Sequence, residues 1–176
     1  MRKQARYQRL RAPLLAATIV AVAFTVVRAR AADDVTSDRL LNADKEAGNW
    51  LLHHKNYSAT RFSSLKDINK DNVKNLKVAW TFSTGVLRGH EGAPLVVGDT
   101  MYLVTPFPNL VYALDLTKPG APVKWKYEPK QDPDAIPIAC CDVVNRGVAL
   151  YKGKVYVGTL DGRLRSEEHT SELQSR

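Results

Sequence analysis

Cysteine is scarce in this sequence of 176 residues, which has only two, the neighbours Cys140 and Cys141. A disulfide-rich scaffold is excluded, because a bond between adjacent residues closes no long loop. A zinc site made by this pair alone is disfavoured, since zinc-binding cysteines are usually about two to four residues apart. The Cα atoms of neighbours lie about 3.8 Å apart, closer than the roughly 4.4 Å minimum of ordinary disulfides. The residues alone leave open a strained disulfide between neighbours and a pair of buried thiols.

Acidic residues are absent from positions 1–31, which contain seven of the 26 lysines and arginines. The remaining chain has 19 basic and 18 acidic residues, a net charge of +1 against +8 for the whole chain. The basic excess therefore belongs to the first 31 residues. This distribution argues against a basic nucleic-acid-binding domain, and we expect no nucleic-acid partner.

The first 31 residues also lack an apolar run as long as the roughly 20 residues that span a bilayer. Their apolar centre, residues 12–27, follows a basic segment and precedes Ala29-Arg30-Ala31. This order is typical of a secretory signal peptide, which we predict for residues 1–31. An uncleaved membrane anchor is the alternative. We expect the mature protein in the periplasm, an oxidising compartment.

The last twelve residues, 165–176, lack the apolar–polar alternation that precedes them. They resemble the in-frame translation of a common sequencing-library adapter, and we set them aside from the fold as a non-native tail. A natural disordered tail is the alternative. The natural domain is then predicted to occupy residues 32–164.

Between these ends the sequence predicts short strands separated by glycine and proline turns, which is typical of an all-β domain. A short helix over 36–47, capped by Thr36 or Ser37 and ended by Gly48, comes first. Apolar residues from Trp50 to Leu65 are spaced like anchors of an irregular segment over a core. A helical turn at 71–76 precedes strands expected at 77–82, 94–97, 100–105, 110–115 and 123–127.

Two internal echoes suggest a repeat. Residues 96–103 resemble residues 150–157, each a strand, a glycine turn and a strand. Trp80-Thr-Phe82 matches Trp125-Lys-Tyr127, 45 residues later. A period of about 40–50 residues with four strands is typical of β-propeller blades, in which recurring tryptophans pack between blades. A β-sandwich with similar hairpins is the alternative.

Three motifs give the chain a family resemblance: residues 89–94 (GHEGAP), 105–109 (TPFPN) and 139–147 (ACCDVVNRG). From about Asn49 to Leu164 the chain resembles the N-terminal part of pyrroloquinoline quinone (PQQ)-dependent alcohol dehydrogenases, above all the large-subunit type of methanol dehydrogenase. The third motif is the most selective, because adjacent cysteines are rare. The resemblance implies an eight-bladed β-propeller, of which this chain holds the first one to two blades and a short N-terminal helix.

The resemblance also implies a function. The full-length protein would oxidise a primary alcohol to an aldehyde, with PQQ and Ca²⁺ or a lanthanide ion as cofactors. Electrons would pass to a cytochrome c, and a small subunit or a homodimer is possible in the family. The catalytic base and the metal ligands are expected beyond residue 164, so the stretch by itself is expected to be inactive.

Four residues match cofactor-binding positions of the family: Glu91, Cys140, Cys141 and Arg146. The resemblance implies a disulfide between the two cysteines, packed on one face of the PQQ ring. A guanidinium is a planar fork for a carboxylate, and PQQ has three carboxylates, so Arg146 is assigned to the cofactor. An ion pair of Arg146 with Asp142 is the alternative from the residues alone. Glu91 would repel the cofactor unless it is paired, or protonated through burial.

Two other functions stay open at this point. A non-catalytic exported propeller scaffold needs the strand repeats and the tryptophans, but not adjacent cysteines. A quinohaemoprotein alcohol dehydrogenase would carry a fused haem domain whose motif lies outside these residues. The adjacent histidines His53 and His54 resemble a metal pair, but neighbours on a strand point to opposite faces and would not share an ion.

We expect the genomic reading frame to continue past codon 164 through further strand repeats to an acidic metal site. Long-read sequencing of the locus measures this directly. A genomic copy of residues 165–176 followed by a stop codon would contradict the prediction, and would leave a short propeller protein without the dehydrogenase machinery.

Overall fold

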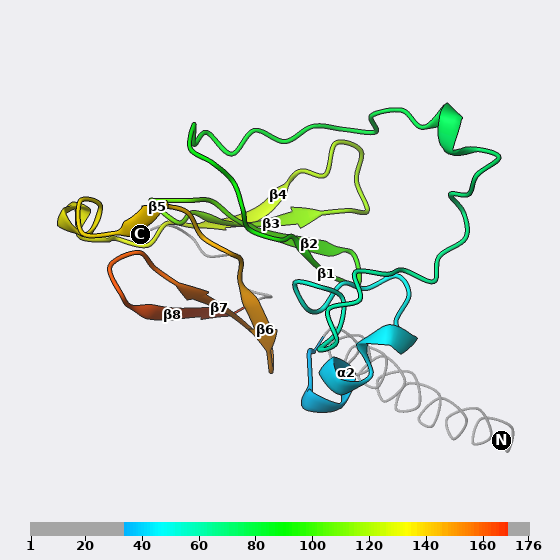
Figure 1. Cartoon of the computed structure of the whole chain (residues 1–176), viewed down its shortest axis with the longest axis horizontal. Coiled ribbons are helices and arrows are strands. Elements are labelled where there is room, and N and C mark those ends of the chain that lie inside the picture. Colours follow the sequence, from blue (N-terminus) through cyan, green and yellow to red (C-terminus); the bar gives the residue numbers. More distant parts are fainter. Residues whose placement is uncertain (1–33, 169–176) are drawn as a thin grey trace, which may run out of the picture. The chain divides into compact units, whose positions relative to one another are not determined.

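The structure is a computed structural model that describes residues 34–168 (Figure 1). All described residues but Asp34 belong to one compact unit, which begins at Val35. The predicted signal peptide and the last eight residues lie outside the described residues. Within residues 34–168, no helix is long and apolar enough to cross a membrane.

The first sheet is a four-stranded antiparallel meander in which every strand pairs with its sequence neighbour. Its strands are β1 (Leu95–Val97), β2 (Thr100–Val104), β3 (Val111–Asp115) and β4 (Val123–Tyr127). Gly98, at φ 53°, lies in the two-residue turn between β1 and β2. These four strands confirm the strands expected between 94 and 127.

The second sheet has the order β6-β7-β8, again antiparallel between neighbours. Its strands are β6 (Ala149–Tyr151), β7 (Lys154–Gly158) and β8 (Leu164–Glu168), and β5 (Cys140–Val143) precedes them. Lys152 and Gly153 both have positive φ in the turn between β6 and β7, the conformation that suits tight hairpins. The predicted hairpin at 150–157 is therefore confirmed, as the counterpart of the hairpin at 96–103.

Strand β8 extends into the segment that the sequence analysis set aside. Residues 165–168 pair with β7 through the backbone, from Val157↔Arg165 to Lys154↔Glu168. None of the five side chains of β8 is buried. The strand therefore adds hydrogen bonds to the sheet but nothing to the core. Its non-native origin stays a prediction.

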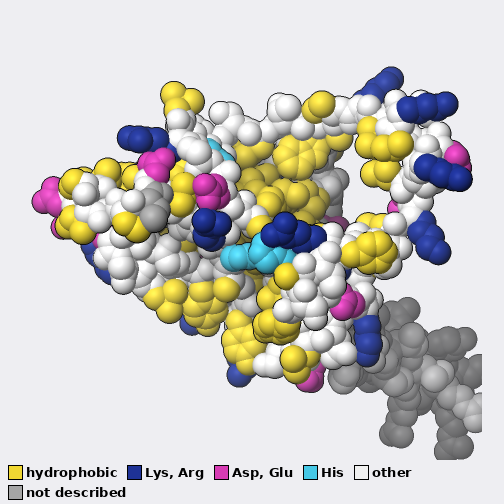
Figure 2. All heavy atoms as spheres, viewed as in Figure 1, with side chains coloured by type: hydrophobic (Ala, Val, Ile, Leu, Met, Phe, Trp, Pro, Cys, Tyr) yellow, Lys and Arg dark blue, Asp and Glu magenta, His cyan; other side chains and the backbone are white. Residues whose placement is uncertain are grey.

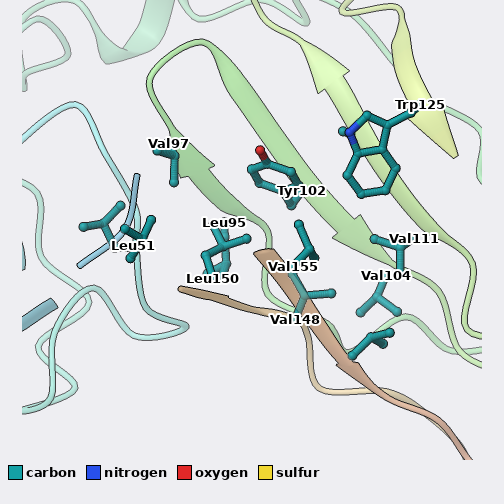
Figure 3. Close-up of a cluster of buried hydrophobic side chains, with 13 residues drawn as sticks. Leu51, Leu95, Val97, Tyr102, Val104, Val111, Trp125, Val148, Leu150 and Val155 are labelled. Atoms are coloured by element: carbon teal, nitrogen blue, oxygen red, sulfur yellow. The ribbon is translucent and has the colours of Figure 1, made fainter. Parts of the chain in front are cut away.

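The main hydrophobic core takes side chains from both sheets (Figure 3). In β2 burial alternates along the strand, so Tyr102 and Val104 face this core while Met101 and Leu103 face the other side. The buried members are Val35, Leu51, Leu95, Val97, Tyr102, Val104, Val111, Ala113, Trp125, Val148, Leu150, Val155 and Val157. Trp125 packs at 6.1 Å, centroid to centroid, from Tyr102, as a structural tryptophan should.

A second apolar cluster covers the other face of the first sheet. Trp80 and Phe82 pack against buried residues of β3, and the Phe82 and Tyr112 rings meet edge to face at 5.1 Å. The Tyr112 hydroxyl donates to the Thr84 carbonyl at 2.9 Å. The chain is thereby held against this face just before it reaches Glu91.

Three predictions for the N-terminal half are wrong in whole or in part. The helix α2 spans Ser37–Leu41 and ends well before Gly48, because the backbone leaves the helical region at Asn42 (φ −109°, ψ 24°), whose side chain also donates to the Asp38 carbonyl. Thr36 is its N-cap, as expected, and the 3-10 helix η1 follows at Ala43–Lys45. Residues 77–82 form no strand, because their backbone pairs with no strand of the described part, although Trp80 and Phe82 pack against the first sheet.

The third correction concerns the loop after His54. Tyr57, Phe62 and Leu65 are 68%, 68% and 56% exposed, so they do not anchor this segment to the core. Hydrophobic and basic side chains stand out along the loop across the upper right of the view (Figure 2). The predicted helical turn at 71–76 is confirmed as the 3-10 helix η2, Val73–Asn75.

The segment before this loop is held firmly. Trp50 exchanges two backbone hydrogen bonds with Val96 of β1, at 2.8 and 3.0 Å. The buried ammonium of Lys55 donates to the carbonyls of Glu46 and Asn49 at 2.8 and 2.6 Å, and it lies 5.5 Å from the centre of the Trp50 ring. Burial lowers the pKa of Lys55. These contacts place residues 51–54 beside β1.

Hydrogen bonds in the turn after β3 make the stability of the fold depend on pH. Asp115 accepts hydrogen bonds from the hydroxyl and the backbone N–H of Thr117, at 2.5 and 3.0 Å, which lower the pKa of Asp115 to about 2. A carboxyl whose pKa is lowered by folding stabilises the fold above its unfolded pKa of about 3.9. That stabilisation is lost as the pH falls through about 2.

We expect Thr117→Val to raise the pKa of Asp115 towards its ordinary value, because the hydroxyl donor is gone. The stability difference between the original chain and the variant should then be present at neutral pH and vanish in acid. Carboxyl-carbon NMR titration measures the pKa, and the exposed Thr60→Val is the matched control. An unchanged titration midpoint for Asp115 in Thr117→Val would contradict this account.

Candidate functional site

The structure brings together two of the four predicted site residues. Glu91 lies in the segment that leads into β1, and Arg146 lies in the loop between β5 and β6. The Arg146 Nε atom is 3.3 Å from the Glu91 Oε2 atom, an ion pair. The backbone joins the same segments, since the Ala93 N–H donates to the Arg146 carbonyl at 3.2 Å. Of the two states open to Glu91, the structure shows the paired one.

A second ion pair links the same two segments. The Arg88 Nη1 atom lies 3.7 Å from the Asp142 Oδ1 atom. Asp142 therefore pairs with Arg88, and the alternative pair of Asp142 with Arg146 is not formed. The sequence analysis missed Arg88. The only indication in the sequence is a charge pattern: a basic residue precedes an acidic one at Arg88 and Glu91, and the order is reversed at Asp142 and Arg146. That signal has meaning only once the two segments are known to be neighbours.

All four charged side chains are accessible. Those of Arg146 and Glu91 are 80% and 48% exposed, and those of Arg88 and Asp142 are 61% and 54% exposed. Exposed ion pairs contribute only about 0–1 kcal/mol to stability. The backbone and the core therefore hold the two segments together, and the charges stay available to a ligand.

The cysteine pair lies on β5, at the start of the same motif. Cys140 is exposed, and the side chain of Cys141 lies outside the described part of the chain. The disulfide between them stays a prediction. Asp142, directly after the pair, has φ 67°, a left-handed conformation that is uncommon outside glycine. The Val143 carbonyl accepts from the Phe107 N–H at 2.9 Å, which connects β5 to the motif at 105–109.

The histidines take separate partners. The His53 Nε2 atom lies 2.9 Å from the Val148 carbonyl oxygen, while the His54 Nδ1 atom accepts from Arg61. His90, for which the sequence suggested no role, bonds to the Thr84 hydroxyl and to the Arg88 carbonyl. Across the described residues, no three His, Cys, Asp or Glu side chains gather in a way that would hold a metal ion.

Two pockets lie away from the Glu91–Arg146 and Arg88–Asp142 ion pairs. One, of about 430 Å³, is apolar and lies between Leu51, His53 and Leu150. The other, of about 500 Å³, has the carboxylates of Asp132 and Asp161 in its wall. Neither includes Glu91 or Arg146.

The residues present fit one carboxylate of PQQ. The Arg146 guanidinium is mostly exposed, and its partner Glu91 restrains it without covering it. The charges of the four ion-paired residues sum to zero. The site therefore offers the hydrogen-bond donors of its arginines but no net positive charge. A tricarboxylate bound here would need further cations from outside these residues, which agrees with the metal ion that the family resemblance implies.

Comparisons with known proteins agree with this picture. Residues 50–171 match the family model described as "PQQ: Glucose/ethanol/alcohol dehydrogenase, beta-propeller domain". The chain is 54% identical over 128 residues to a lanthanide-dependent methanol dehydrogenase of Methylacidiphilum fumariolicum, covering 73% of this chain and 21% of that protein. It is 47% identical over 150 residues to subunit 1 of "Methanol dehydrogenase [cytochrome c]" of Paracoccus denitrificans, covering 85% of this chain and 24% of that protein.

A solved structure gives the same result for the fold. The chain superimposes on a europium-containing methanol dehydrogenase with a TM-score of 0.74 and 51% identity, over 77% of this chain and 24% of that one. The prediction of an all-β propeller with a short N-terminal helix is confirmed. The chain spans about a fifth to a quarter of the length of these relatives.

Gly147 offers a direct test of the site's packing. It has φ 137°, and a Cβ atom placed on it would lie 2.6 Å from His53 Nε2. We expect Gly147→Ala to destabilise the chain by about 1–3 kcal/mol, because both the backbone conformation and the contact oppose a side chain. Chemical unfolding measures the change.

Gly48→Ala is the matched control, since nothing lies within 4 Å of a Cβ atom there and its φ is not positive. Equal stability of the two variants would show that the His53–Gly147 contact is not formed.

Proposed function

The chain belongs to the PQQ-dependent alcohol dehydrogenase family of β-propeller proteins, and we propose that the full-length protein is an exported methanol-type dehydrogenase. It would oxidise a primary alcohol to an aldehyde. The observation that carries the proposal is the Glu91–Arg146 pair, which places two residues of separate family motifs at one accessible site.

The proposed cofactors are PQQ and either Ca²⁺ or a lanthanide ion. When bound, PQQ supplies the oxidant, since it accepts the hydride equivalent that the alcohol carbon loses. The names of two relatives, one lanthanide-dependent and one europium-containing, support a lanthanide as the metal. The two ion pairs carry no net charge, which supports a cation elsewhere in the pocket to balance the carboxylates of PQQ.

Each of the four site residues has a definite task in the proposal. Arg146 binds one cofactor carboxylate with the donors of its guanidinium. Glu91 orients that guanidinium through the Nε atom of Arg146, and the same contact neutralises the negative charge of Glu91. Cys140 and Cys141, joined as a disulfide, pack on one face of the ring and exclude water from it. The group that takes the alcohol proton, and the metal ligands, are not among these residues.

The proposed electron acceptor is a cytochrome c, and the proposed compartment is the periplasm. The acceptor is supported by the name of the Paracoccus relative, a methanol dehydrogenase designated for cytochrome c. The compartment rests on the signal-peptide pattern of residues 1–31. A small subunit or a homodimer is part of the proposal only as a property of the family.

The test uses the full-length protein of the locus. We expect dye-linked oxidation of short primary alcohols only when PQQ and Ca²⁺ or a lanthanide are both present. Arg146→Lys should raise the dissociation constant of PQQ about ten- to a hundredfold, because a charge-assisted fork contact contributes about 1.5–3 kcal/mol.

Cys140→Ala/Cys141→Ala separates this proposal from a propeller scaffold. A dehydrogenase should lose activity with this double change, whereas a scaffold needs neither cysteine. Lys118→Ala, which removes an exposed ammonium in the loop after β3, is the matched surface control. Dye reduction that does not depend on PQQ would refute the proposed function.

A further inference from the structure

Four consecutive residues of the loop between β5 and β6 make contacts that hold the backbone around Arg146. They are Asn145, Arg146, Gly147 and Val148. The Arg146 carbonyl accepts from Ala93, and the Val148 side chain is 2% exposed within the main core. The remaining contacts come from two side chains, His53 and Asn145, that the proposed chemistry does not use.

His53 supports the loop from the N-terminal segment, 95 residues away in sequence. A carbonyl oxygen only accepts hydrogen bonds, so the His53 Nε2–H donates to the Val148 oxygen at 2.9 Å. The ring edge also lies directly against Gly147, where a Cβ atom would be 2.6 Å from Nε2 and 3.0 Å from Cε1. His53 therefore both bonds the loop and limits its movement towards the N-terminal segment.

Asn145 is itself a residue of the loop and ties it to the second sheet. Its side-chain Nδ2 donates to the Gly158 carbonyl at the end of β7, at 2.9 Å. Its Oδ1 atom accepts from the Gly147 N–H at 3.0 Å. One side chain thus ties the loop to β7 and sets the turn on both sides of Arg146.

The Arg146 side chain contrasts with this rigid backbone, because it is 80% exposed. We propose that His53 and Asn145 are positioning residues for Arg146, which hold its backbone so that the guanidinium meets a carboxylate of PQQ. The inference rests on the proposed function. A backbone that is already in the bound conformation loses less entropy when the ligand binds, so it increases affinity without a new contact.

The experiment titrates PQQ into the full-length apo-protein with Ca²⁺ present and follows the quenching of tryptophan fluorescence. The variants are His53→Leu and Asn145→Ala, each in the original protein and in an Arg146→Ala background. His54→Leu is the matched control, since His54 is exposed and its side chain bonds to Arg61 of the exposed loop. His53→Gln, which keeps an N–H donor, tests for rescue.

We expect His53→Leu and Asn145→Ala to raise the dissociation constant of PQQ about tenfold when Arg146 is present, and less than twofold when it is Ala. His54→Leu should leave the constant unchanged, and His53→Gln should restore most of the affinity. A merely structural role would weaken binding equally in both backgrounds. Melting temperatures are recorded throughout, and Asn145→Ala carries the test alone if His53→Leu does not fold.

Three results would overturn the inference. Equal dissociation constants for His53→Leu, Asn145→Ala and His54→Leu would overturn it and leave the proposed function intact. Equal losses with and without Arg146 would do the same. Absence of PQQ binding by the unmodified protein would overturn the proposed function and the inference together.

Discussion

Burial of aliphatic side chains between the two sheets is the interaction on which the site depends. Leu95, Val97 and Val104 from the first sheet share one core with Leu150 and Val155 from the second. Each such side chain contributes about 1.5–3 kcal/mol when it leaves water, which exceeds the effect of any exposed ion pair in the chain. Because β1 and β6 are held by this core, the segments just before them, with Glu91 and Arg146, become neighbours.

The site and the core divide their physical tasks. The apolar cluster and the backbone bonds, such as Ala93 to Arg146, determine where the segments lie. The charged side chains contribute little to stability and remain exposed, which is what a binding site for an anionic ligand requires. The Arg146 guanidinium offers directional hydrogen bonds. Because the four charges sum to zero, a polycarboxylate bound as we propose would need a cation held elsewhere.

The N-terminal segment links the core to the site. The bonds of Trp50 to Val96 and of Lys55 to two carbonyls hold residues 49–55 beside β1. This places His53 against Gly147 and Val148, although nothing in the local sequence of His53 indicates such a contact. The pair that resembled a metal site thus has two structural roles: His53 supports the Arg146 loop, and His54 binds an arginine of the exposed loop.

The sequence by itself determined the all-β class and the hairpins, because apolar–polar alternation and glycine turns are local features. The residues proposed to bind the cofactor came from the family resemblance. The sequence also indicated that Glu91 must be either paired or protonated if it lies beside the cofactor. Only the tertiary structure decided that Glu91 pairs with Arg146, that Asp142 pairs with Arg88, and that Tyr57 and Phe62 are exposed. It also decided that residues 77–82 form no strand. Each of these depends on which segments lie side by side, and the burial of two sheets against each other sets that at sequence separations that no local pattern encodes.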